Sequence, residues 1–241
     1  MAVKKLEYNN NIFLINYDIL NNNQEKIILF LHGWGSNKEI MKQAFSNKLR
    51  SFKHIYIDMP GFGRSLNDKI LTTKDYENIV NLFLEILNIN KKDISILGHS
   101  FGGKVATLLE PKNLILCSSA GILEPKPFFV RLKIILSKIF NIFGIGKLTK
   151  YFRSKDVDKM SQNMYETFKN VVDEDFIDIF KKFNNNCLIF WGEQDSATSV
   201  ESGKIINNLI KKSCFVSYQG NHFFFIDNSD KICAIMEKKL D

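Results

Sequence analysis

Short, continuously apolar runs alternate along the chain with longer segments whose apolar residues recur at helical spacing. Uninterrupted apolar runs are typical of strands that are buried on both faces of a sheet. Strands are predicted over residues 12–17, 27–31, 55–57, 94–97, 114–117, 188–191 and 214–216. Helices are predicted over residues 37–49, 74–87, 102–109, 203–211 and 229–240. This alternation predicts an α/β fold with a mostly parallel central sheet flanked by helices; only between 122 and 183 is the pattern helical throughout.

The composition is typical of a globular protein with a large core, since 45% of the 241 residues are apolar. No apolar stretch is long enough to span a membrane, and the opening Met-Ala-Val-Lys-Lys has no signal-peptide core, so a cytoplasmic protein is expected. The four cysteines lie far apart in sequence, without the spacing of zinc or redox sites, and are expected to be small buried hydrophobic residues. Neither a metal ion nor an organic cofactor is expected.

The net charge of +7 is concentrated in one part of the sequence. Residues 122–155 contain eight basic residues and one acidic residue, so the rest of the chain is balanced. A nucleic-acid-binding protein would more often show basic residues mixed with exposed aromatic residues in a recognisable module, and no such module occurs here. Nucleic acid is therefore not expected as a partner.

The hexapeptide GHSFGG at residues 98–103 follows the predicted strand 94–97 and precedes a predicted helix. Its first five residues form the pattern G-x-S-x-G, which at this position predicts a nucleophile elbow, a strained turn that presents Ser100 above the sheet. Glycines flank the serine because the strand and helix backbones converge there and leave little room for Cβ atoms. A glycine-rich structural turn is the alternative that the pentapeptide alone leaves open.

Four further motifs accompany this one in a fixed order. They are LHGWG at 31–35, DMPGFGRS at 58–65, FWGEQD at 190–195 and GNH at 220–222. On these five motifs the chain resembles serine hydrolases of the α/β-hydrolase fold over essentially its whole length. The resemblance implies an α/β-hydrolase core at 1–121 and 184–241, with a helical cap inserted at 122–183. A serine in the elbow, in place of an aspartate, argues against the epoxide hydrolase and haloalkane dehalogenase branches.

The resemblance assigns the reacting groups in the order serine, acid, histidine. Ser100 needs a base, because a serine hydroxyl is a weak nucleophile at neutral pH, and that base needs a partner that fixes its tautomer. His222 is the histidine that follows both other motifs, and it is the implied general base. Asp195, at the end of FWGEQD, is the implied acid, with Glu193 as its local rival. His99, next to the nucleophile, is expected to have a structural role.

An acyl-transfer reaction also needs donors for the oxyanion that develops on the substrate, and backbone N–H groups are already oriented for that purpose. The resemblance implies that the amides of Phe101, after the nucleophile, and of Trp34, after the HG pair, are these donors. His32 of that pair is expected to shape the loop. The indole of Trp34 is expected to line the substrate pocket.

Within the implied cap, apolar residues recur at helical spacing and form one wide apolar face. They are Phe128, Leu132, Ile135, Leu136, Ile139, Phe140 and Phe143. Phe128 and Leu132 are candidate substrate-binding residues, together with Trp34; packing of the cap onto the core is the alternative explanation of this face. Basic residues beside it would also permit a helix at a membrane surface, although membrane contact is not expected.

These features predict a serine hydrolase that cleaves a small-molecule carboxylic ester or thioester with an apolar acyl group, through an acyl-enzyme. Two alternatives use the same scaffold: a ligand-binding protein with little turnover, and a carbon–carbon bond hydrolase or lyase with the same triad. HGWG with the serine, aspartate and histidine is also similar to pimeloyl-carrier-protein methyl esterases. That similarity implies an acidic acyl carrier protein as a partner for the basic segment 122–155, whose alternative is an ordinary solvated surface.

Overall fold

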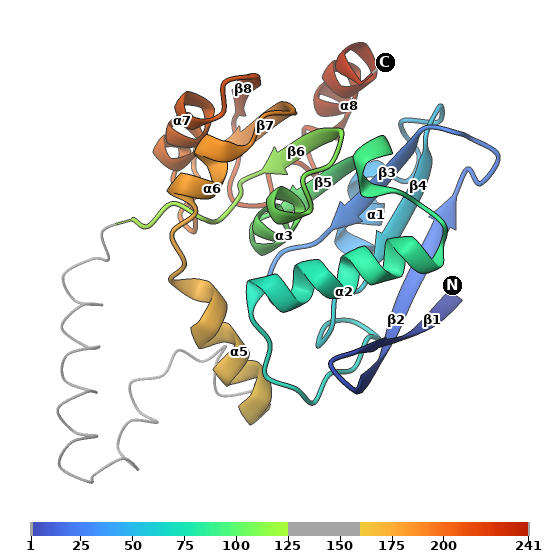
Figure 1. Ribbon diagram of the computed structural model, residues 1–241. Coiled ribbons are helices and arrows are strands. Elements are labelled where there is room, and N and C mark those ends of the chain that lie inside the picture. The colour runs from blue at the N-terminus through green and yellow to red at the C-terminus, as the bar shows by residue number, and fades with distance from the viewer. Residues whose placement is uncertain (1, 125–159, 241) are drawn as a thin grey trace, which may run out of the picture.

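The computed structural model describes residues 2–124 and 160–240 (Figure 1). The described residues form one eight-stranded sheet with the strand order β1-β2-β4-β3-β5-β6-β7-β8. The strands are β1 (Ala2–Tyr8), β2 (Asn11–Leu20), β3 (Ile27–Leu31), β4 (Lys53–Ile57), β5 (Ser95–His99), β6 (Asn113–Cys117), β7 (Asn186–Gly192) and β8 (Ser213–Tyr218). β2 pairs antiparallel with β1 and β4, and all other neighbours are parallel. The predicted mostly parallel α/β fold is confirmed.

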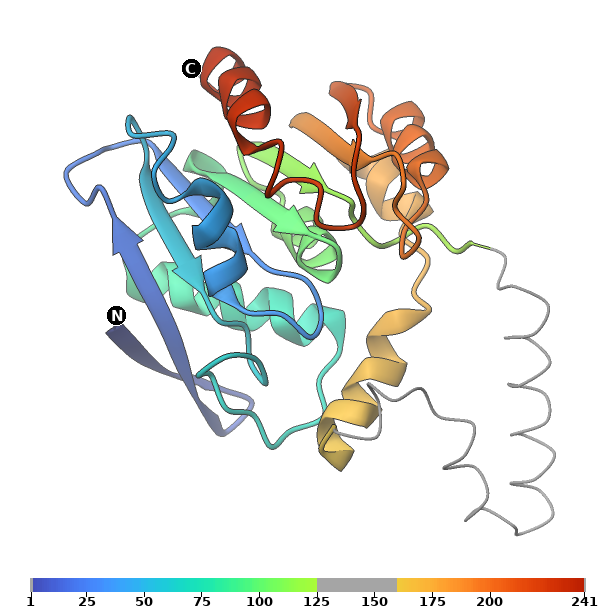
Figure 2. The same cartoon turned by 180° about the vertical axis from the view of Figure 1, so that it is seen from behind.

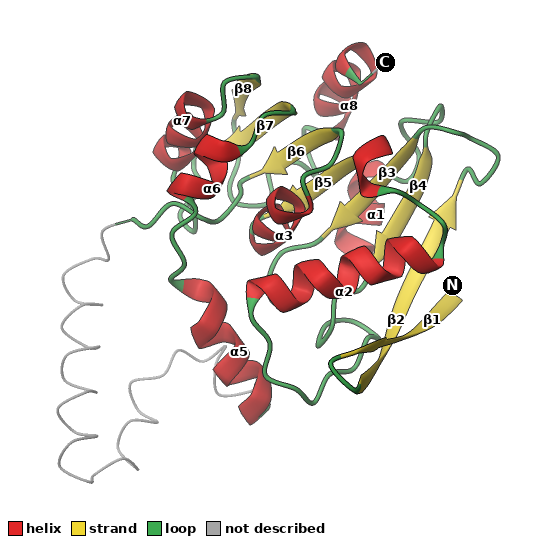
Figure 3. Cartoon of the chain, viewed as in Figure 1, coloured by secondary structure: helices red, strands yellow, loops and turns green. Residues whose placement is uncertain are grey.

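Helices cover both faces of this sheet (Figures 2 and 3). They are α1 (Lys38–Phe45), α2 (Thr73–Ile86), α3 (Phe101–Leu109), α5 (Gln162–Val172), α6 (Ile177–Lys182), α7 (Val200–Leu209) and α8 (Ser229–Lys239). Side chains of α2, α3, α6 and α7 share one apolar cluster, and those of α1 and α8 share a second. In β3, Leu29 and Leu31 join the first cluster while Ile28 and Phe30 join the second. Burial on both faces explains why the central strands are continuously apolar in sequence.

Local sequence sets the starts of the first two helices. The Asn37 side chain accepts a hydrogen bond from the Glu39 amide at the start of α1, and Thr72 and Asp75 form a capping box at the start of α2. α1 ends at Phe45, four residues before the predicted end at 49. Leu49 has a φ of 50°, a left-handed conformation that a continuing helix does not accept.

The sheet edge differs from the prediction, because β1 was not predicted and β2 extends beyond 12–17. Within β1 the side chain of Leu6 is buried, whereas Lys5 and Glu7 are exposed. An edge strand of this kind carries charges in place of a continuous apolar run. The cysteines also differ in part, since Cys117, Cys187 and Cys233 are buried as expected but Cys214 is exposed.

The connection from β6 to β7 carries α5 and α6 in its described part, and residues 118–124 and 160–185 contain no strand. Phe180 of α6 is fully buried in the cluster that α3 and α7 share. α5 is tied to the loop before α2, where the Leu71 amide donates to the Thr167 hydroxyl across 3.0 Å. The limits of a cap at 122–183 stay a prediction, and Phe128 and Leu132 lie outside the described residues.

Candidate active site

Ser100 lies in the turn between β5 and α3, with a φ of 51° and a ψ of −116°. A non-glycine residue with positive φ is strained, and such strain is what an elbow uses to lift a side chain out of the sheet. The backbones converge here: a Cβ atom on Gly98 would lie 2.3 Å from the Gly102 carbonyl oxygen. Ser100 is half-buried and lines a cavity of about 540 Å³. The structure therefore gives Ser100 the backbone geometry that the motif predicted.

His222 and Asp195 are brought together from the loops after β8 and β7. The His222 Nδ1 atom lies 2.7 Å from Asp195 Oδ2, and the carboxylate is fully buried. The other carboxylate oxygen accepts hydrogen bonds from the amides of Ala197 and Thr198, at 2.8 and 3.0 Å. Burial alone would raise the pKa of Asp195, but the hydrogen bonds from His222 and the Thr198 amide outweigh it and lower that pKa to about 2. The acid is thus ionised and held in one orientation.

The rival carboxylate of Glu193 is engaged elsewhere. It accepts a hydrogen bond from the Ser217 hydroxyl at 3.0 Å and another from the side chain of Gln219. Glu193 is exposed, whereas Asp195 is buried beside the imidazole. The geometry favours Asp195 over Glu193 as the partner of His222.

His99, the residue before Ser100, contacts the histidine loop directly. Its Nε2 atom donates to the backbone carbonyl of His222 across 3.0 Å, and the two imidazole rings lie 4.6 Å apart. Burial, together with the neighbouring His222, lowers the pKa of His99 to about 3, so its ring is neutral at physiological pH. This geometry is consistent with the structural role expected of His99, and its partner, the His222 carbonyl, was not indicated by the sequence.

The loop of the HGWG motif lies against the nucleophile. A Cβ atom on Gly33 would be 3.2 Å from the Ser100 Cβ and 2.8 Å from His99 Nδ1, so only glycine fits at this approach. The indole of Trp34 packs against the ring of Phe101 with centroids 5.6 Å apart. Both residues predicted as oxyanion donors line the Ser100 cavity.

His32 fixes the direction of the peptide group between Gly33 and Trp34. Its Nε2 accepts a hydrogen bond from the Met59 amide at 3.1 Å, so Nδ1 carries the proton and donates to the Gly33 carbonyl at 2.8 Å. Burial lowers the pKa of His32 to about 4, which keeps it in this neutral form. In a trans peptide the N–H points opposite to the carbonyl. The Trp34 N–H is thereby turned away from His32.

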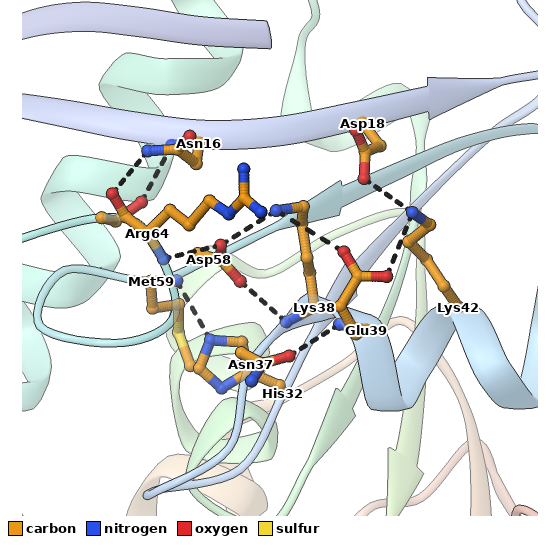
Figure 4. A network of polar contacts seen from close by, with 11 residues as sticks. Asn16, Asp18, His32, Asn37, Lys38, Glu39, Lys42, Asp58, Met59 and Arg64 are labelled. Carbon is orange, nitrogen blue, oxygen red and sulfur yellow. Dashed lines mark hydrogen bonds and ion pairs between the residues drawn. The ribbon is translucent and has the colours of Figure 1, made fainter. Parts of the chain in front are cut away.

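A buried ion pair clamps the other side of the same loop. Asp58 accepts hydrogen bonds from the Lys38 amide at 2.8 Å, the Lys38 ammonium at 2.9 Å and the Arg64 amide at 3.0 Å (Figure 4). Both side chains of the pair are at most 2% exposed. Paired charges satisfied in this way hold their geometry rigidly, because breaking either partner leaves a buried charge alone. DMPGFGRS thus holds the start of α1, directly after the loop that carries Gly33 and Trp34.

Lys104 is a residue of the cavity that sequence reasoning missed. It lies on α3 one turn after Ser100, is 1% exposed, and lines the same cavity. Its ammonium donates to the Val171 carbonyl at the end of α5 and to Glu174 at 2.6 Å. Burial lowers the pKa of Lys104, and Glu174 opposes that shift. The signal available in the sequence was a single charged residue in the otherwise uncharged helix FGGKVATLL.

Residues 2–124 and 160–240 contain no group of three His, Cys, Asp or Glu side chains that could hold a metal ion. Within the same two ranges, no helix combines the length and apolar character needed to cross a bilayer.

Comparisons with known proteins place this geometry in a family. A family model described as "Alpha/beta hydrolase family" matches residues 28–231. The uncharacterized hydrolase YugF from Bacillus subtilis (strain 168) is 24% identical over 238 residues, covering 83% of this chain and 84% of that protein. The pimeloyl-[acyl-carrier protein] methyl ester esterase from Proteus mirabilis (strain HI4320) is 31% identical over 86 residues, covering 36% of this chain and 31% of that esterase.

Solved structures share the fold. An esterase (EaEST) from Exiguobacterium antarcticum superimposes with a TM-score of 0.73 at 20% sequence identity, over 94% of this chain and 95% of that chain. At this identity the likeness concerns the fold, and the chemistry has to be argued from the residues of the site.

Proposed function

The chain belongs to the alpha/beta hydrolase family, and from this premise we propose that this hydrolase cleaves carboxylic esters or thioesters with apolar acyl groups, using Ser100, His222 and Asp195. The observation that carries the proposal is the 2.7 Å contact between His222 Nδ1 and the buried Asp195 carboxylate. His222 is linked to the strained Ser100 through the adjacent His99, which donates to the His222 carbonyl. Because Nδ1 is engaged by Asp195, the Nε2 atom of His222 is the nitrogen left to take a proton from Ser100.

The reaction follows from these roles. His222 accepts the Ser100 hydroxyl proton as the oxygen attacks the ester carbonyl carbon, and Asp195 stabilises the imidazolium that forms. The tetrahedral intermediate collapses, the bond to the alcohol or thiol breaks, and His222 protonates that leaving group. Water, deprotonated by His222, then attacks the acyl-enzyme, the bond from the acyl carbon to the Ser100 oxygen breaks, and His222 returns the proton to that oxygen as the carboxylic acid leaves.

The oxyanion would be stabilised by two backbone amides. Phe101 is the first residue of α3, so its N–H has no partner within the helix and lies at the positive end of the helix dipole. The second donor is the Trp34 N–H, whose direction is set by the bond from His32 to the Gly33 carbonyl. Donors that are fixed before the reaction stabilise the developing charge without further reorganisation.

The apolar acyl group is supported by the cavity lining. Trp34, Phe101, Phe168 and Val171 contribute aromatic and aliphatic surface next to Ser100. Burial of apolar substrate atoms contributes about 25 cal/mol for each Å² that is removed from water.

Two further parts of the proposal rest on the sequence alone. Phe128 and Leu132 of the cap are proposed as further substrate contacts, and an acidic acyl carrier protein is proposed as the partner of the segment 122–155.

Labelling with a fluorophosphonate tests the nucleophile. The wild-type protein should be labelled, and Ser100→Ala should abolish the label. Ser196 also lines the cavity and is the rival hydroxyl, so Ser196→Ala should retain labelling. Transfer of the label to Ser196, or no label on the wild type, would contradict the proposed nucleophile.

Turnover of p-nitrophenyl esters of increasing chain length tests the reaction class. Ester hydrolysis lost in Ser100→Ala supports the proposal. A labelled but non-hydrolysing protein would favour the ligand-binding alternative. Cleavage of a carbon–carbon bond in place of ester hydrolysis would favour the carbon–carbon bond hydrolase or lyase.

A further inference from the structure

The cavity beside Ser100 has a neighbour of about 350 Å³, and one residue lines both. That residue is Trp34, since the remaining described lining residues of the two cavities differ. Trp34 is thus the described residue that the two cavities have in common, and it belongs to the loop of a proposed oxyanion donor.

Aromatic contacts hold the indole of Trp34 between the two spaces. On the side of the Ser100 cavity it packs against Phe101 and Phe168, with ring centroids 5.6 and 5.3 Å away. On the side of the second cavity it packs against Phe62, with centroids 4.9 Å apart. The ring thus has packing partners that belong to each cavity.

The second cavity is suited to an alkyl chain. Among its described lining residues are Phe62, Met160 and Met164, and none of the described ones is charged. Met164 is packed so closely onto Gly61 that a Cβ atom there would lie 2.4 Å from the Met164 sulfur. Methionine side chains are flexible and adapt to apolar ligands of varying shape.

The Ser100 cavity, by contrast, has a charged part. Lys104, Asp173 and Glu174 line it in addition to the aromatic residues. An alkyl chain that displaced water from these charges would pay their desolvation, so a lengthening acyl chain is directed to the aromatic side, where it meets Trp34.

The indole N–H of Trp34 is buried and has no hydrogen-bond partner among the described residues. The ring is therefore held by packing alone, so replacing it with phenylalanine removes no hydrogen bond. Trp34→Phe, which keeps an aromatic ring at this position, is therefore a matched control for Trp34→Ala, which removes the ring.

We propose that the Trp34 side chain is the chain-length determinant of the enzyme, a partition that keeps long acyl chains out of the apolar cavity lined by Phe62, Met160 and Met164. This inference rests on the proposed ester hydrolysis at Ser100. The backbone N–H of Trp34 keeps its separate role as an oxyanion donor in every side-chain variant.

The test compares p-nitrophenyl decanoate with p-nitrophenyl butyrate as the ratio of their kcat/KM values. Trp34→Ala should raise this ratio tenfold or more, since each methylene that becomes buried adds about fourfold. Trp34→Phe should leave it within about threefold of wild type. Met164→Phe, which fills the second cavity, should cancel the gain when it is combined with Trp34→Ala. Introduced alone into the wild type, it should leave the ratio unchanged. If Trp34→Ala does not fold, as judged by its melting transition, Trp34→Val takes its place.

Two results would overturn the partition: an unchanged ratio in folded Trp34→Ala, or a changed wild-type ratio in Met164→Phe. Failure of the proposed function looks different, because then no variant hydrolyses any ester. In that event the binding of a fluorescent long-chain fatty acid to Ser100→Ala, with and without Trp34→Ala, reports on the partition by itself. Tighter binding by at least tenfold with Trp34→Ala supports it, and equal binding refutes it.

Discussion

The imidazole of His99 donates a hydrogen bond to the backbone carbonyl of His222 across 3.0 Å, so the residue before the nucleophile holds the loop of the proposed base. His99→Phe keeps a ring of similar size and removes the donor. A hydrogen bond of about 1 kcal/mol that fixes the base should cost about fivefold to tenfold in kcat. The measurement is kcat for a short p-nitrophenyl ester, together with the melting temperature. Unchanged kcat in a folded variant would mean that the loop does not depend on His99.

His99 and His32 should also make the protein sensitive to acid. Their pKa values in the folded chain are about 3 and about 4, below the ordinary value of 6.5. Below pH 6.5 the unfolded chain therefore binds more protons, and the free energy of unfolding falls as the pH falls toward those values. Each histidine should contribute up to about 1.4 kcal/mol per pH unit.

Urea unfolding at several pH values between 7 and 4.5 checks this dependence. His99→Phe removes one titrating group, so its free energy of unfolding should fall less steeply with pH than that of the wild type. Parallel curves for the two proteins would show that His99 titrates alike in the folded and unfolded chains.

Ser100, His222 and Asp195 should behave as one unit in kinetics. Ser100→Ala and His222→Ala should each lower kcat by about 10⁴ or more, and Asp195→Asn somewhat less, because each removes a group on which the others depend. The double variant of Ser100 and His222 should be little worse than either single one. If the losses in kcat multiply in the double variant, Ser100 and His222 act independently, and the triad assignment is wrong.

The local sequence indicated the elements and residues whose signals are contained in short segments. The strand before GHSFGG is continuously apolar because β5 is buried on both faces, and the glycines of the motif follow from the contact of β5 with α3. Asp195 and His222 also stand in short motifs, FWGEQD and GNH, which directly follow β7 and β8. The carboxyl ends of these neighbouring parallel strands lie at the same edge of the sheet.

The contacts between distant segments could not be predicted in the same way. The bond from His99 to His222 and the ion pair of Lys104 with Glu174 join residues far apart in sequence, and neither leaves a periodic pattern. β1 was missed because an edge strand tolerates charged residues. Sequence patterns report burial, and they identify a polar partner only when it is nearby in the chain.

Lys104 should be a larger contributor to stability than any exposed ion pair. Lys104→Met removes the ammonium donor from the Val171 carbonyl and from Glu174, which keeps its hydrogen bond from the Thr73 hydroxyl. The substitution should lower the free energy of unfolding by about 2 kcal/mol, a value reduced because Glu174 is 30% exposed. Adding Glu174→Gln should cost little more. Lys92→Met, which breaks the exposed pair with Glu110, is the matched control and should cost less than about 1 kcal/mol.

Denaturation in urea measures these differences. If Lys104→Met and Lys92→Met lower the free energy of unfolding equally, burial does not make the ion pair of Lys104 with Glu174 more stabilising than the exposed pair. Additive losses for Lys104→Met and Glu174→Gln would show that the two side chains act separately.

The basic segment 122–155 gives the last prediction, which concerns the proposed carrier-protein partner. Eight basic residues against one acidic residue would attract an acidic carrier toward Ser100, and such attraction weakens as salt screens it, with a Debye length of about 8 Å at physiological ionic strength. Replacing Arg131, Lys133 and Lys138 with glutamate should lower kcat/KM for an acyl-carrier substrate tenfold or more at low salt, and should spare small uncharged esters. Equal effects on both substrates, or no effect on either, would make the segment an ordinary solvated surface.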